Sequence, residues 1–130
     1  MQFRVPKNTE TIRWTEHVKE KMRFYCLSET MVRRVLRRPD RIEEGIALRT
    51  TAVMKRKDGR TTKNEIWVMY QKRELRKKKE ESSAGAKRFK DILDKKNRII
   101  IISAWRYPGV SPKGAPPIPK DVILEIEKLV

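Results

Sequence analysis

The chain has 130 residues, of which 33 are Lys or Arg and 17 are Asp or Glu, so its formal net charge at pH 7 is +16. This length suits one domain with one hydrophobic core, and this charge favours a polyanionic partner: nucleic acid, an anionic membrane surface or an acidic protein. The single cysteine, Cys26, excludes an internal disulfide, and no Cys/His cluster has the spacing of a zinc site.

Two short amphipathic helices are predicted near the N-terminus, after a short strand over residues 2–5. Thr15 has the side chain of an N-cap for a first helix over 16–25. Ser28 has the same role for a second helix, which Pro39 stops. Apolar residues recur at helical spacing in both segments, so each helix has one face to bury. A tight turn between them makes a helical hairpin.

The hydrophobic pattern then changes to the alternation that is typical of β-strands. Residues 45–57 are rich in β-branched side chains and end at Asp58-Gly59, a strong turn signal. Residues 64–72 and 98–107 alternate between two faces, and the second segment is apolar on both, which indicates a central or covered strand. We therefore predict the α+β class, with the helical hairpin packed on one face of a three- to four-stranded antiparallel sheet.

Two polar segments interrupt or follow this predicted sheet. Residues 72–96 combine high charge density with a Ser-Ser-Ala-Gly centre, so we expect a basic flexible insertion between the last two strands. Residues 108–130 begin as an extended Pro-rich arm and end in a short helix, with Pro119 suited to its first turn. The predicted organisation is one domain over 1–107, followed by this arm and C-terminal helix.

The sequence shows neither the pattern of a targeting signal nor a cluster of metal-ligating residues. The first ten residues lack the apolar run of a signal peptide, and the longest aliphatic run, 99–102, is too short to span a bilayer. We therefore expect a cytoplasmic protein without membrane contact. Divalent ions need several convergent acidic ligands, and no carboxylate cluster is present, which argues against a two-metal nuclease. No metal or other cofactor is expected.

The candidate catalytic residues begin with His17, the only histidine of the chain. On a helix, His17 and Lys21 lie one turn apart on the same side. A neutral imidazole accepts a proton near pH 7, and a lysine beside it holds a phosphate. The sequence leaves an alternative open, in which His17 is a polar residue on the rim of the helix and Lys21 is a solvated charge.

Two clusters of cations are candidate nucleic-acid contacts. Guanidinium groups bind phosphate well, and the second predicted helix carries four of them opposite its apolar stripe: Arg33, Arg34, Arg37 and Arg38. The insertion carries a second cluster, suited to nonspecific contact with RNA or DNA: Lys77, Lys78 and Lys79. The alternatives are a solvated helix face and a solvated loop.

The last predicted strand ends with an aromatic ring, a guanidinium and a phenol in succession. Trp105 is a candidate for base stacking, Arg106 for phosphate neutralisation and Tyr107 for positioning or relaying a proton. Trp67 on the neighbouring strand is a further candidate. Strict alternation places Ile101, Trp105 and Tyr107 on one face and Arg106 on the other. The alternative is that the aromatic residues belong to the core and Arg106 is merely exposed.

Residues 17–45 read "HVKEKMRFYCLSETMVRRVLRRPDRIEEG". A histidine is followed four and five places later by a basic residue and a methionine, and then come an aliphatic-Ser turn, a Val-rich helix and a proline. This pattern, with the order helix, helix, antiparallel sheet, resembles the RelE/BrnT-like superfamily of ribonuclease toxins. It is more closely similar to an uncharacterised bacterial branch, a domain of unknown function. The resemblance covers residues 15–107. The Pro-rich arm with its C-terminal helix and the long basic insertion are not part of the family pattern.

The resemblance implies a compact sheet that cradles RNA, and a metal-independent endoribonuclease in which a 2′-OH attacks the neighbouring phosphate. His17 or Tyr107 then takes the 2′-OH proton. Lys21 and Arg106 stabilise the charge of the phosphorane, and Trp105 stacks a base. Two other functions stay open: a noncatalytic RNA- or ribosome-associated binding module, and a component whose basic surface docks an acidic, antitoxin-like protein. The oligomeric state stays open as well.

Overall fold

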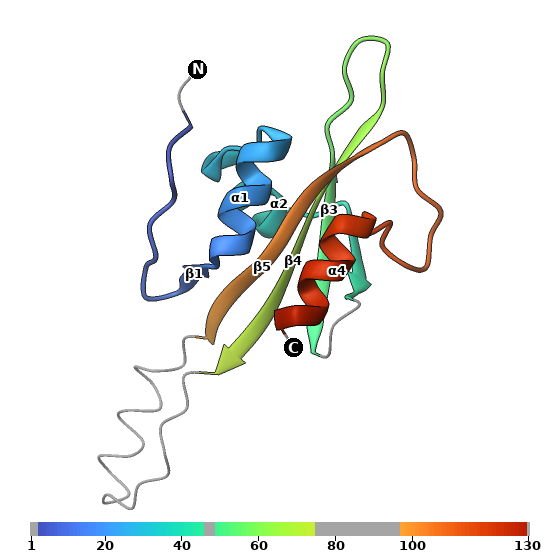
Figure 1. The fold of residues 1–130 in the computed structure, drawn as a ribbon. Helices are drawn as coiled ribbons and strands as arrows, with labels where there is room; N and C mark the ends of the chain where they lie inside the picture. The colour runs from blue at the N-terminus through green and yellow to red at the C-terminus, as the bar shows by residue number, and fades with distance from the viewer. Residues whose placement is uncertain (1–2, 46–48, 75–96, 130) are drawn as a thin grey trace, which may run out of the picture.

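The computed structural model describes residues 3–45, 49–74 and 97–129. They form one sheet with helices packed against both of its faces (Figure 1). The elements in chain order are β1 (Ile12–Trp14), α1 (Glu16–Tyr25), α2 (Glu29–Arg37), β2 (Arg41–Glu44), β3 (Thr50–Arg56), β4 (Asn64–Glu74), β5 (Asn97–Pro108) and α4 (Lys120–Leu129). The predicted α+β class is confirmed.

The sheet has five strands in the order β1-β5-β4-β3-β2. Strands β2 to β5 are consecutive antiparallel neighbours, whereas β1 pairs in parallel with residues 99–101 of β5. The predicted number of strands, three to four, is therefore wrong, and the predicted antiparallel pairing holds for β2 to β5 but not for β1. The strand expected over 2–5 is also wrong for its described residues, 3–5, because the first strand begins only at Ile12.

Both helices of the hairpin begin where their caps predict. The Thr15 side chain accepts a hydrogen bond from the Val18 amide, and the Ser28 side chain accepts one from the Met31 amide. Each cap thereby satisfies an amide of the first turn that has no partner within the helix. α1 ends at Cys26, whose φ of 57° reverses the chain toward α2.

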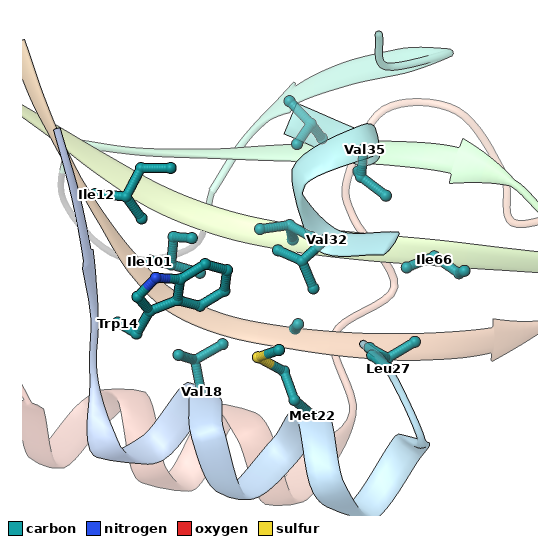
Figure 2. Close-up of a cluster of buried hydrophobic side chains, with 12 residues drawn as sticks. Ile12, Trp14, Val18, Met22, Leu27, Val32, Val35, Ile66 and Ile101 are labelled. Atoms are coloured by element: carbon teal, nitrogen blue, oxygen red, sulfur yellow. The ribbon is translucent and has the colours of Figure 1, made fainter. Parts of the chain in front are cut away.

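The helical hairpin packs its apolar stripes on one face of the sheet (Figure 2). Full burial of one large apolar side chain contributes about 1.5–3 kcal/mol, so the cluster between hairpin and sheet supplies much of the stability of the fold. Its buried members are Ile12, Trp14, Val18, Met22, Leu27, Val32, Val35, Val53, Ile66, Val68, Ile101 and Ala104.

β5 contains an irregularity that changes which of its side chains share a face. A register shift in the pairing with β4 leaves Ile102 without an opposite residue, as in a β-bulge. Ile101 and Ala104 consequently lie in the cluster under the hairpin, whereas Trp105 lies in the cluster on the other face. Strict alternation, which placed Ile101 and Trp105 together, is wrong at this point.

α4 covers the face of the sheet that the hairpin leaves open (Figure 1). Val122 of α4 is fully buried there against side chains from three strands: Ala52, Met54, Trp67, Met69 and Trp105. The C-terminal helix is therefore part of the packed structure, although it follows the Pro-rich arm. Among the helices that the structure describes, none combines the length and apolar character that crossing a bilayer requires.

Candidate nucleic-acid interface

Three exposed arginines lie on the outer side of α2 and at its C-cap. α2 buries Val32 and Val35 against the sheet. Helical geometry then directs Arg34 and Arg37 to the opposite side, and Arg38 follows as the C-cap residue; all three are exposed. Within the described part of the chain none of them forms an ion pair. We call Arg34, Arg37 and Arg38 the arginine face.

Arg33 lies beside the arginine face, and its side chain already binds other residues of the protein. Its Nε donates to Glu29 Oε2 at 2.8 Å, and its guanidinium carbon lies 5.9 Å from the ring centroid of Trp14. The ion pair and the ring contact hold this guanidinium against α2 and β1. Four arginines were predicted to contact nucleic acid. Three of them are exposed without an ion pair or ring contact to any described residue, and the fourth, Arg33, is bound to Glu29 and Trp14.

The predicted catalytic residues of α1 are engaged with β5 and α4. His17 is 9 % exposed, and its Nε2 lies 3.0 Å from the hydroxyl oxygen of Ser103, which is fully buried in β5. Lys21 forms an ion pair with Asp121 at the start of α4. The hydrogen bond from Lys21 holds the pKa of Asp121 below its usual value. Both side chains thus fasten α1 to its neighbours.

Arg106 binds the C-terminal end of α1. Its Nε and Nη2 donate to the Tyr25 carbonyl at 3.3 and 3.2 Å, and Nη2 also donates to the Cys26 carbonyl at 3.4 Å. The last carbonyls of a helix lack partners within the helix and carry partial negative charge, so a guanidinium there stabilises α1. Tyr107, next on the strand, is half-buried against the core cluster on the α4 side.

These four candidates do not meet at one point. His17 contacts β5 from the first turn of α1, whereas Arg106 contacts the last residue of α1, Tyr25. From residue 17 to residue 25 an α-helix rises about 12 Å. The imidazole and the guanidinium are therefore held at opposite ends of α1, and Lys21 between them is paired with an acidic side chain.

The two tryptophans predicted to contact nucleic acid lie in the core. Trp67 and Trp105 are each 0 % exposed, and their rings stack on one another with centroids 6.1 Å apart and planes 5° apart. In this conformation neither ring offers a face to a base. Trp105 has the core role that was its alternative prediction, and Trp67 lies in the same core cluster. The remaining predicted contacts lie outside the described residues: Lys77, Lys78 and Lys79.

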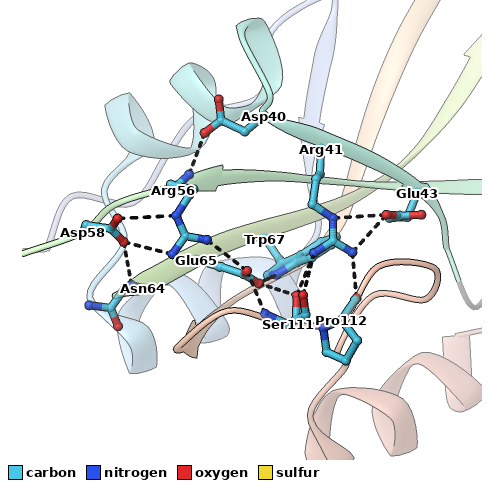
Figure 3. A network of polar contacts seen from close by, with 10 residues as sticks. All are labelled: Asp40, Arg41, Glu43, Arg56, Asp58, Asn64, Glu65, Trp67, Ser111 and Pro112. Carbon is cyan, nitrogen blue, oxygen red and sulfur yellow. Dashed lines mark hydrogen bonds and ion pairs between the residues drawn. The ribbon is translucent and has the colours of Figure 1, made fainter. Parts of the chain in front are cut away.

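A buried polar network, which the sequence did not predict, joins β4 to the Pro-rich arm (Figure 3). Glu65 is 0 % exposed, and its carboxylate accepts hydrogen bonds from Trp67 Nε1 at 2.9 Å and Arg56 Nη1 at 3.2 Å. The amide and hydroxyl of Ser111 donate to the same carboxylate at 2.9 and 2.6 Å. A buried carboxylate needs such donors. The only signal in the sequence was a glutamate on the same strand face as a tryptophan.

Arg41 extends this network from β2. Its guanidinium donates to Ser111 Oγ at 2.9 Å and to the Pro112 carbonyl at 3.0 Å. It also pairs with Glu43 at 2.9 Å and lies 5.0 Å from the Trp67 ring centroid. Figure 3 shows these contacts converging between the strands and the arm. The network therefore fixes the start of the arm, and with it the path of the chain toward α4.

Glu65→Gln is expected to lower stability by about 2 kcal/mol at pH 7. Burial raises the pKa of Glu65, but the hydrogen bonds from Ser111 and Trp67 outweigh it, so the folded-state pKa lies below the usual value. Such a carboxyl stabilises the fold above its unfolded pKa of about 4.3, and this contribution is lost as pH falls through the folded pKa.

Urea unfolding at several pH values measures this effect, with the exposed Glu44→Gln as the control. The difference between wild type and Glu65→Gln should shrink as the pH falls below about 4. A difference that stays constant from neutral to strongly acid pH would contradict the role given to the ionised carboxylate.

Comparisons with protein-family models, curated proteins and solved structures found no match for this chain. Among the described residues, no group of three or more His, Cys, Asp or Glu side chains is arranged to hold a metal ion. The titratable candidates on α1 and β5 make contacts within the fold, and the arginine face is open to solvent. Anion binding on α2 is the chemistry that this arrangement offers most directly.

Proposed function

We propose that this protein binds RNA through the arginine face of α2. The observation that carries the proposal is the exposure of Arg34 and Arg37 on the outer side of α2 and of Arg38 at its C-cap, without an ion pair to any described residue. Guanidinium groups form charge-assisted, often bidentate hydrogen bonds with phosphate. The net charge of +16 adds a field that draws polyanions toward the protein.

A RelE/BrnT-like fold over residues 15–107 belongs to the same proposal. It is supported by the order of elements, in which a helical hairpin precedes the antiparallel strands β2 to β5 and covers one face of them. β1 and α4 lie outside that range. The RNA partner includes ribosomal RNA in this proposal, and the positive charge also favours an acidic, antitoxin-like protein.

We favour a noncatalytic binding function over a metal-independent endoribonuclease. A general base must come within hydrogen-bond reach of the proton that it takes, and His17 is buried. The basic candidates already have partners within the fold: His17 has Ser103, Lys21 has Asp121, and Arg106 has the end of α1.

Purified protein incubated with labelled RNA in EDTA is expected to bind the RNA and leave it intact. His17→Ala and Arg106→Ala are expected to preserve both results, at a temperature where circular dichroism shows that both variants are folded. Gel electrophoresis measures cleavage, and a gel-shift assay measures binding. Cleavage that persists in EDTA and disappears in both variants would contradict the noncatalytic function. Absence of RNA binding would contradict the proposal as a whole.

A further inference from the structure

All three tryptophans of the chain are buried, so the protein offers no exposed indole to a nucleobase. Trp14 is 2 % exposed, and Trp67 and Trp105 are completely buried. Proteins that bind single-stranded nucleic acid without sequence preference combine cations with aromatic rings on which the bases stack. The arginine face supplies the cations without the rings.

We propose that the arginine face binds the phosphate backbone of double-helical nucleic acid, independently of base sequence. A duplex keeps its bases stacked inside and presents mainly phosphate charge. That charge is dense, with one phosphate per about 1.7 Å of axis in duplex DNA against about 3.4 Å for one strand. A purely cationic surface therefore gains more from a duplex than from a single strand. This inference rests on the proposed function, and it specifies base-paired, double-helical segments of the nucleic acid as the ligand.

The geometry of the arginine face suits this ligand. Arg34 and Arg37 are three residues apart on α2, which places their Cβ atoms about 5–6 Å from one another on the helix surface. Arg38 is the C-cap residue directly after Arg37, so three exposed, charged side chains gather at the C-terminal end of α2. They reach neighbouring phosphates without any need to enter a groove, where bases are read.

Phe24 allows a test of the alternative binding mode, in which an aromatic ring of the protein stacks on an unpaired base of a single strand. Among the described residues it is the aromatic side chain most open to solvent, at 71 % exposed. It lies on α1, where its ring contacts Tyr25 edge-on with centroids 4.9 Å apart and lies 5.7 Å from Lys21 Nζ. Among the residues that the structure describes, single-strand binding by stacking would depend most on Phe24, whereas phosphate binding by the arginine face does not.

Fluorescence anisotropy with oligonucleotides of equal length tests the inference. The probes are duplex RNA, duplex DNA and one strand of each without self-complementarity. Both duplexes are expected to bind about tenfold more tightly than the single strands at about 0.1 M salt. For three phosphate contacts on a duplex, log affinity should fall against log salt with a slope of roughly −2.7. Phe24→Ala should change each affinity by less than about twofold.

A preference for the single strands, or a loss of about tenfold in Phe24→Ala, would overturn the inference and leave RNA binding in place. A difference of more than about tenfold between duplexes of different sequence would also overturn it, because it requires contacts to base edges. Failure of every probe to bind would instead overturn the proposed function itself.

Discussion

Replacing Arg34, Arg37 and Arg38 together with glutamine is expected to weaken RNA binding by roughly a hundredfold at about 0.1 M salt. Each guanidinium neutralises a phosphate and releases its counterion, so on a duplex the slope of log affinity against log salt should become shallower by about 2.7. The three side chains are exposed, so the free energy of unfolding should change by less than about 1 kcal/mol. Anisotropy titrations over a salt series and urea unfolding measure these quantities.

Lys57, Arg60 and Lys63 are the matched control for this variant. They are exposed, they lie between β3 and β4, and their replacement by glutamine removes the same amount of charge. In this control variant only the long-range attraction between protein and RNA is weakened, so the affinity for RNA should fall by less than about fivefold. Equal losses in the two triple variants would show that total charge governs binding, which would contradict the assignment of the arginine face.

Trp105→Ala is expected to lower the free energy of unfolding by about 3–5 kcal/mol. The side chain is fully buried, stacks on Trp67 and lies in one cluster with Val122 of α4. Its removal leaves a cavity that the neighbours fill only in part. Domains of this size are stable by about 5–15 kcal/mol in total, so the urea midpoint of the variant should fall sharply.

Trp105→Phe separates a core role from a base-stacking role. The phenyl ring keeps much of the volume and the stacking contact, so we expect a loss of stability of about 1–3 kcal/mol. RNA affinity should equal that of the unsubstituted protein in conditions where the variant is folded. A large loss of RNA affinity with unchanged stability would contradict the core assignment and would make Trp105 a base-stacking residue.

Features of the fold that depend on local sequence were predictable. The caps Thr15 and Ser28 mark the starts of α1 and α2, and alternation marks β4 and much of β5. β1 and β2 were missed because they have only 3 and 4 residues and are strands through pairing with β5 and β3. The irregularity at Ile102 also comes from pairing, and no local pattern signals it.

In the candidate site, too, features that depend on local sequence were predictable and features that depend on long-range packing were not. Exposure of Arg34 and Arg37 followed from the amphipathic pattern of α2, because Val32 and Val35 define its buried side. The partners of His17 and Arg106 depend on how α1 lies along β5, which the helix sequence does not specify. Burial of Trp105 depends on α4 returning across the sheet after the arm, a long-range packing that periodicity cannot reveal.

An NMR titration of isotope-labelled protein with a short RNA duplex tests the central claim most directly, because chemical-shift changes locate the contact without a mutation. We predict that the largest changes fall on the arginine face and on its neighbours in α2. Signals of His17, Ser103 and Tyr107 should stay unchanged. If the largest changes fall on those three residues while α2 is unaffected, the arginine face is not the surface that binds RNA.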